Sequence, residues 1–356
     1  MLSRPTGPSY IQQGKPVDIF EGPSDKLPTE AASPEEIARF VAEAAVNAPS
    51  VHNTQPWRFH HGEHEVSISA NNERQLMFAD PDGREMMISC GAALFNMRVA
   101  LRYLGLVPKV RVLPDHDLPN LVARVSWDQQ VPALGYEKVL FEQITRRRTH
   151  RGGFDPAPLP DELLSALPGQ AAKENAALSL LVQDQQRAGA LAAVVEAGDY
   201  ALRLNSDRAK EEARWAPGPS SQRQDGVPPT AYPAHPERTE PSFRSRDYAH
   251  GHGWGLPPEA EEPVLRSAGV VGLLTTSVDQ PTDWIHAGQA LQRVLLVASS
   301  YNVAAALHSQ PLEIPLLRDF IRIHLSGHAY PQMVLRLGVT SEKAVSVRRP
   351  VDEVLF

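Results

Sequence analysis

The sequence has little cysteine and no long apolar run, and each absence narrows what the chain can be. Cys90 is the single cysteine among 356 residues, which excludes an internal disulfide and a zinc site built from cysteines. No apolar run reaches the roughly 18 residues of a transmembrane helix. The N-terminus lacks the charged-then-apolar pattern of a secretory signal. We therefore expect a cytoplasmic protein that does not associate with membranes.

The sequence also lacks an excess of positive charge. Its formal net charge is −7 and its pI is near 6.0, whereas general nucleic-acid binders are basic, so we predict no nucleic-acid partner. His60, His61 and His64 hint at a metal site. Successive strand residues point to opposite faces, however, and the sequence positions no acidic or cysteine partner to complete a site, so we predict no metal.

Proline is abundant, at 32 of 356 residues, against a usual share of ~5%. Ten of these prolines lie in residues 217–263, together with four aromatic side chains, those of Tyr232, Phe243, Tyr248 and Trp254. So much proline excludes a long helix or a sheet, and long irregular segments are either functional lids or disordered. The aromatic side chains favour a lid.

Hydrophobic periodicity predicts an order of helices and strands along the rest of the chain. Ser33, Pro34 and Glu36 form a helix start with a capping box. Predicted helices cover residues 33–47, 85–104, 135–145, 161–167, 185–204 and 283–307. Predicted strands cover residues 57–60, 66–70, 110–113, 121–125, 178–182, 270–275 and 333–337.

Two parts of this order repeat. The helix motif G-A-A-L at 91–94 matches G-Q-A-L at 288–291, and the strand motif P-N-L-V-A-R-V at 119–125 matches P-Q-M-V-L-R-L at 331–337. Two matches in the same order indicate a duplicated unit. We predict an N-terminal extension over 1–32, a first half over 33–130, and a second half over 131–356 that includes the 217–263 segment.

Residues 48–59, A-P-S-V-H-N-T-Q-P-W-R-F, join the first predicted helix to the first predicted strand. Pro49 ends the helix, and Pro56 biases Gln55 toward extended geometry. A stiff loop that presents Ser50, Asn53 and Gln55 would suit a planar ligand with heteroatoms at its edge. A polar surface loop with two prolines would show the same local pattern.

This loop resembles the flavin-ring loop of the nitroreductase family, and most closely its Acg-type branch, which reads A-P-S-x-H-N-x-Q-P-W. Further similarity lies in G-R-E at 83–85, S-C-G-A at 89–92 and R-R-P-V-D-E-V at 348–354. The resemblance implies an α+β nitroreductase-like fold, with a mixed, mainly antiparallel sheet in each half around two long central helices. Family members are obligate dimers that hold a flavin at each subunit interface. A duplicated chain is therefore expected to be a monomeric pseudo-dimer with one flavin, although a higher oligomer stays open.

R-R-T-H-R at 147–151 resembles the family signature R-R-[ST]-x-R, which cradles the FMN phosphate. Guanidinium groups suit this role because they bind phosphate oxygens in pairs. Gly152-Gly153-Phe154 is one residue longer than the family pattern. Arg348 or Arg349 would also reach the phosphate, unless these two only pair with nearby carboxylates. The candidate FMN residues are Pro49, Ser50, Val51, Asn53, Gln55, Arg147, Arg148, Thr149, Arg151, Ser309, Gln310, Arg348 and Arg349.

The resemblance implies an FMN-binding oxidoreductase. NAD(P)H would reduce the flavin, which would then reduce a small nitroaromatic or quinone-type acceptor. Because the chemistry belongs to the cofactor, no catalytic side chain is predicted. The alternative is an FMN-sequestering or storage protein with little turnover, in which a lid carrying Phe243, Tyr248 or Trp254 covers the flavin.

Overall fold

The computed structural model describes residues 32–233, 235, 237–244, 246, 263–342 and 344–356. The predicted extension over 1–32 lies almost wholly outside the described residues. Two of the proposed lid side chains, Tyr248 and Trp254, lie outside them as well.

The first half consists of a helix, a four-stranded sheet and a long central helix. Helix α1 (Pro34–Ala45) starts as predicted, with Ser33 and Glu36 forming the capping box. The strands are β1 (Trp57–His61), β2 (Glu65–Ala70), β3 (Leu106–Val112) and β4 (Leu121–Gln130), and the long helix is α2 (Arg84–Tyr103). The sheet order is β1-β2-β4-β3, and every pair is antiparallel.

The second half repeats this plan. Its elements are α4 (Asp161–Ala172), β5 (Ala177–Leu181), β8 (Val270–Thr276), α7 (Pro281–Ser300), β9 (Ala304–His308) and β10 (Tyr330–Gly338). The sheet order is β5-β8-β10-β9, again antiparallel. Each element of the first half thus has a counterpart at the same place in the order. The predicted fold class, α+β with two long central helices and a mainly antiparallel sheet in each half, is confirmed.

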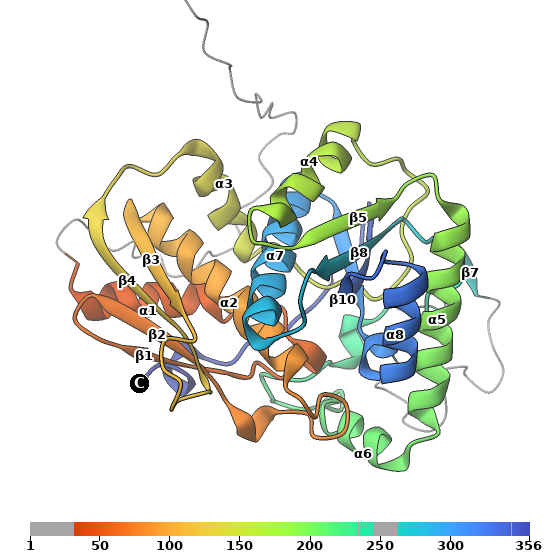
Figure 1. The fold of residues 1–356 in the computed structure, drawn as a ribbon, viewed down its shortest axis with the longest axis horizontal. Coiled ribbons are helices and arrows are strands. Elements are labelled where there is room, and N and C mark those ends of the chain that lie inside the picture. Colours follow the sequence, from red (N-terminus) through yellow and green to blue (C-terminus); the bar gives the residue numbers. More distant parts are fainter. Residues whose placement is uncertain (1–31, 234, 236, 245, 247–262, 343) are drawn as a thin grey trace, which may run out of the picture.

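The central helices α2 and α7 pack against each other between the two sheets (Figure 1). Their contact is reciprocal at two glycines. A Cβ on Gly91 would lie 2.3 Å from the carbonyl oxygen of Ile285, and a Cβ on Gly288 would lie 2.0 Å from that of Ile88. Gly91 and Gly288 are the first residues of the two repeated motifs. The repeat therefore places equivalent residues opposite each other where the helices cross.

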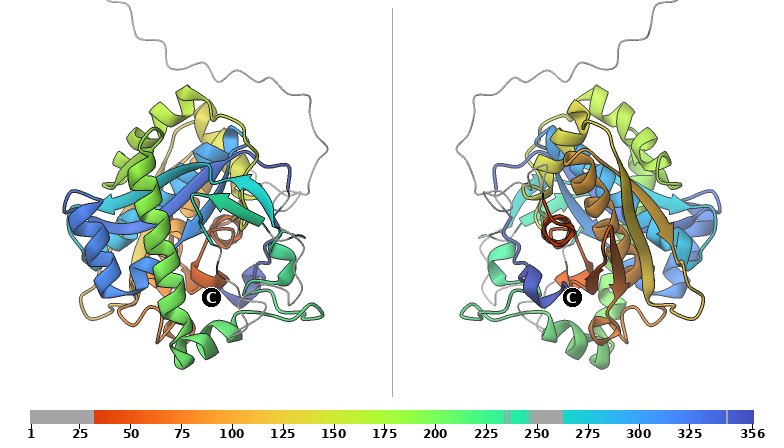
Figure 2. Two further views of the ribbon diagram at one scale, coloured as in Figure 1. Left: turned by 90° about the vertical axis from the view of Figure 1, so that its right-hand side faces the viewer. Right: turned by 90° about the vertical axis from the view of Figure 1, so that its left-hand side faces the viewer.

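Further elements surround this repeated unit. They are α3 (Gly135–Ile144), α5 (Gln185–Arg203), α6 (Ser206–Arg214), α8 (Pro315–His324) and a parallel pair, β6 (Glu237–Glu240) and β7 (Val264–Ser267). Helix α3 follows the boundary predicted at residue 131, yet Leu140, Phe141 and Ile144 pack into the core of the first half. Helix α5 lies on one outer side of the molecule and the first sheet on the opposite side (Figure 2).

One predicted helix extends wrongly into a strand. The helix predicted over 283–307 ends at Ser300, and Asn302 adopts a left-handed φ of 58° before β9 begins. Left-handed residues end helices, and the apolar run beyond Asn302 is a buried strand. The helix predicted over 185–204 is confirmed as α5, and Asn205, whose side chain caps α6, begins a separate helix. Among the described helices, none is both long and apolar enough to span a membrane.

Candidate functional site

The loop between α1 and β1 has an unusual backbone. His52, Asn53 and Gln55 have φ values of 47°, 53° and 50°, a region that costs energy for residues other than glycine and that clusters at functional sites. The prediction of extended geometry at Gln55 is therefore wrong. Ser50 Oγ accepts a hydrogen bond from the Gln55 N–H at 2.9 Å, and Ser89 Oγ accepts one from the Val51 N–H at 3.3 Å. These bonds fix the loop against α2.

A cavity lies between this loop, α2, α7 and the end of β9. It contains about 830 Å³ of empty space, counting the part open to solvent, and its middle is apolar, lined by Ile88, Ala92, Leu291, Leu307 and Met333. Several of the predicted flavin residues line it, namely Pro49, Ser50, Val51, Thr149, Arg151, Ser309 and Gln310. The cavity thus brings together residues from three distant parts of the sequence.

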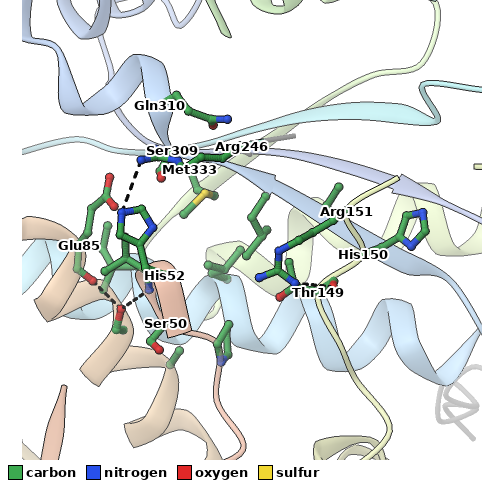
Figure 3. A pocket seen from close by; sticks show the side chains of 18 residues that line it. Ser50, His52, Glu85, Thr149, His150, Arg151, Arg246, Ser309, Gln310 and Met333 are labelled. Atoms are coloured by element: carbon green, nitrogen blue, oxygen red, sulfur yellow. Dashed lines mark hydrogen bonds between the residues drawn. The ribbon is translucent and has the colours of Figure 1, made fainter. Parts of the chain in front are cut away.

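Polar groups stand on opposite sides of the cavity (Figure 3). Arg151 and Thr149 lie on one side, whereas Glu85, His52 and Arg246 lie on the other. Burial and the nearby Glu313 raise the pKa of Glu85, although Arg84 donates to its carboxylate at 2.8 Å. Burial, together with the charge of Arg246, holds the pKa of His52 well below its ordinary value, so this imidazole is neutral at pH 7.

Beside Arg151, the two predicted arginine motifs meet. Burial, followed by the charges of Arg147, Arg148 and Arg151, holds the pKa of Arg348 well below its ordinary value. Burial, followed by the charges of Arg148 and Arg151, lowers the pKa of Arg147 to about 9. We call Arg147, Arg148, Arg151 and Arg348 the four-arginine cluster.

Two N–H groups of the four-arginine cluster lack a hydrogen-bond acceptor among the described residues. In the part of the chain that the structure describes, Arg147, Arg148 and Arg348 form no ion pair with a carboxylate. The Nε atoms of Arg147 and Arg348 are buried and have no hydrogen-bond partner among the described residues. Concentrated buried positive charge without acidic partners is costly, and orphaned donors call for an acceptor. The cluster has the chemistry of an anion site.

Two predicted ring contacts, Asn53 and Gln55, do not line the cavity. Asn53 Nδ2 donates to Gly226 O at 2.9 Å and to Val347 O at 3.1 Å, and Asn53 Oδ1 accepts from Arg348 Nη1 at 3.0 Å. Gln55 Nε2 donates to Gln224 O at 2.8 Å, and Gln55 Oε1 accepts from the Arg349 N–H at 2.8 Å. Their left-handed backbone turns both amides toward these segments, away from the cavity.

The two C-terminal arginines separate in the structure. Arg348 belongs to the four-arginine cluster, whereas Arg349 pairs with Glu353 at 3.1 Å. Of the two predicted roles, phosphate contact therefore fits Arg348 and carboxylate pairing fits Arg349.

The 217–263 segment contributes a residue that the aromatic pattern missed. Phe243 is 5% exposed and packs into the core between α5 and the second sheet, beside His308; it does not line the cavity. Arg246 does line it. Arg246 forms ion pairs with Glu212 and with Glu313, the latter at 2.5 Å. The acids that bind Arg246 are Glu212 in α6 and Glu313 after Gln310. These two carboxylates, which need a cation when buried, were the signal available in the sequence.

The fold and this cavity define a class: two structural repeats around paired central helices, with an anion site beside an apolar cavity. No family model matches the chain. Among curated proteins, "Putative NAD(P)H nitroreductase Rv3131" of Mycobacterium tuberculosis is 32% identical over 305 residues, covering 85% of each chain. "Putative NAD(P)H nitroreductase acg" of the same organism is 26% identical over 323 residues, covering 90% of this chain and 95% of that one. The chain belongs to the nitroreductase family.

Solved structures with a similar arrangement are more distant. A protein described as "a putative nitroreductase" from Anabaena variabilis matches 85% of this chain and 73% of its own, with a TM-score of 0.43 and 11% identity. The nitroreductase NfnB of Mycobacterium smegmatis, solved in complex with NADPH, matches 61% of this chain with a TM-score of 0.32.

Proposed function

We propose that this chain is an FMN-dependent NAD(P)H oxidoreductase. The single observation that carries the proposal is the four-arginine cluster, of which Arg151 lines one side of the cavity beside Thr149. In this assignment the cluster holds the phosphate of FMN, and the loop residues Pro49, Ser50 and Val51 lie against the ring.

The residues present fit this cofactor. A phosphomonoester carries nearly two negative charges and several acceptor oxygens, which would satisfy the orphaned Nε atoms of Arg147 and Arg348. The apolar side chains that line the cavity, among them Ile88, Ala92 and Leu291, suit a flat aromatic ring. Relatives named NAD(P)H nitroreductase support the same assignment.

Each group of the chain would have a limited task. The cofactor, when bound, would supply the hydride chemistry between NAD(P)H and a nitroaromatic or quinone-type acceptor. The arginines would fix the phosphate, and the apolar side chains of α2 and α7 would exclude water from the ring. Ser309 and Gln310, from the end of β9, offer hydrogen bonds at the opposite wall.

A second function, FMN sequestration with little turnover, is favoured by Arg246. Arg246 itself lines one wall of the cavity, and its guanidinium is buried between Glu212 and Glu313. A wall held this firmly would restrict access by an electron donor. Replacing Arg246 with alanine should then speed reduction by NADPH, because the wall loses its ion pairs.

The cofactor assignment is tested by an FMN titration followed through flavin fluorescence. Arg148→Ala combined with Arg151→Ala should weaken binding at least about 100-fold, since hydrogen bonds from charged groups contribute about 1.5–3 kcal/mol each. Arg146→Ala is the matched control, because Arg146 belongs to the same basic run but is exposed; it should bind like wild type. Equal affinity in the double variant would refute the phosphate assignment.

The choice between turnover and sequestration needs a second measurement. The FMN-loaded protein is mixed with NADH or NADPH without oxygen, and the visible flavin band is followed. Rapid bleaching with either donor supports the oxidoreductase. A band that stays oxidised with both donors supports sequestration.

A further inference from the structure

The loop over residues 50–55, which flanks the cavity, also forms hydrogen bonds with Gly226 and with Arg348. Asn53 is the link. Its Oδ1 accepts from Arg348 of the four-arginine cluster, and its Nδ2 donates to Gly226. The Gly226 N–H donates back to Asn53 O at 3.2 Å. We call residues 217–233 the docking segment. It lies against the 50–55 loop through the two hydrogen bonds between Gly226 and Asn53.

We propose that Asn53 couples occupation of the four-arginine cluster by a phosphate group to the docking of residues 217–233. The inference rests on the proposed function for the identity of the natural ligand, FMN. Its physical basis is the contact between Asn53 and both partners at once.

We compare two states of the protein, without and with an anion in the four-arginine cluster. The cluster supplies the difference in free energy between them. Without an anion, the guanidinium groups of Arg147, Arg148 and Arg151 repel the buried guanidinium of Arg348. A bound phosphate removes the repulsion and fixes Arg348 Nη1 against Asn53 Oδ1. Asn53 then holds its amide aimed at Gly226, so the docking segment is stabilised together with the anion site.

Other contacts seat the docking segment without reaching the cluster. Gln55 donates to Gln224 O, and Asp225 pairs with Arg74. Gly226 has a φ of 76°, and a Cβ there would lie 2.6 Å from Trp215 O. Because none of these contacts involves the cluster, an anion bound there does not change them directly. A second link to the cluster exists through Arg151, which lies 5.9 Å from the ring centre of Tyr232.

Coupling of this kind is reciprocal: if phosphate favours docking, docking favours phosphate by the same factor. Typical couplings change an affinity about 5- to 150-fold. The docking segment carries its own reporter, the exposed residue Arg223, after which trypsin cleaves when the segment opens. Cleavage tracks the open population when opening is fast.

The experiment measures the rate of tryptic cleavage after Arg223 by mass spectrometry. Saturating FMN should slow this cleavage at least about 5-fold. Riboflavin carries the same ring without the phosphate and should leave the rate close to that of the protein alone. Slowing by riboflavin equal to that by FMN would overturn the proposal, because the ring alone would then dock the segment.

Two glycine variants, Asn53→Gly and Gln55→Gly, distinguish coupling to the anion from contacts that only hold the docking segment in place. Asn53 and Gln55 both have positive φ, so glycine removes either amide without adding backbone strain. Asn53→Gly should abolish the FMN-dependent slowing, even at saturating FMN. Gln55→Gly should raise cleavage with and without FMN and leave the ratio of the two rates as in wild type.

Failure of the coupling is distinguishable from failure of the proposed function. If wild type binds no FMN in the titration, the proposed function fails. If FMN binds but cleavage after Arg223 does not slow, or slows equally in Asn53→Gly, the coupling is refuted while FMN binding stands.

Discussion

His308, the last residue of β9, accepts a hydrogen bond from Arg336 Nε at 2.9 Å. Both side chains are fully buried, and Arg336 lies between the rings of Phe154 and Phe243. Burial, followed by the charges of Arg336 and Arg246, holds the pKa of His308 well below its ordinary value. The imidazole must stay neutral for this contact to persist.

The consequence is a predicted acid sensitivity. Below pH ~6.5 the unfolded chain takes up a proton at this histidine and the folded chain does not, so stability falls as pH decreases, by about 1.4 kcal/mol per pH unit. His308→Gln keeps an acceptor but cannot titrate. The difference in unfolding free energy between wild type and variant, measured in urea from pH 7 to 5, should therefore shrink or reverse with falling pH. The exposed His61→Gln is the control; an identical pH dependence in His308→Gln and wild type would contradict the argument.

Some site residues could be predicted from the sequence and others could not. Arg147 and Arg148 were predicted because several cations in a short run suit an anion, and Arg348 or Arg349 because the C-terminal motif resembles that of the family. The structure brings Arg147, Arg148 and Arg348 together. Asn53 and Gln55 were placed on the ring, yet each bonds to chain well over a hundred residues away. An amide accepts many partners, and its choice here depends on a left-handed backbone that local sequence does not encode.

At the scale of elements, periodicity predicted most helices and strands, because the core faces of α2, α7 and the strands are continuous. It failed where an apolar run changes structure without changing composition. The run through Val303 to Leu307 reads as helix, but the left-handed Asn302 turns it into β9. The end of β9 then supplies Ser309 and Gln310 to the cavity, so this boundary determines part of the site.

The crossing of α2 and α7 gives a prediction on glycine. Gly288→Ala would put a methyl group 2.0 Å from the carbonyl oxygen of Ile88, a backbone atom that cannot rotate away. Separating the helices should cost at least about 1–3 kcal/mol, the usual penalty of overpacking. Gly189→Ala in α5 meets nothing within 4 Å and should stabilise by about 0.4–1 kcal/mol. Thermal unfolding of both variants checks the pair, and a neutral Gly288→Ala would exclude the close crossing.

At the scale of the whole molecule, duplication raises the question of a second site. The loop between α1 and β1 corresponds to residues 173–176, between α4 and β5. There, Glu174 is 5% exposed and accepts from Arg98 of α2 at 2.5 Å and from Arg293 of α7 at 2.7 Å. Both guanidinium groups also lie over the ring of Phe95. The loop that corresponds to the cavity loop is therefore held in an ion-paired network with both central helices.

The two halves have therefore become unequal: one has the cavity beside its loop, and the other has Glu174 ion-paired with two arginines at the corresponding loop. We predict that FMN saturates at one equivalent per chain in a calorimetric titration, and that Glu174→Gln leaves this stoichiometry unchanged. Because α2 and α7 already provide the paired interface within one chain, sedimentation should give the mass of a single chain, 39.1 kDa. Two equivalents of FMN per chain would show that the mirrored position still binds, and a stable dimer would show that duplication has not replaced association between subunits.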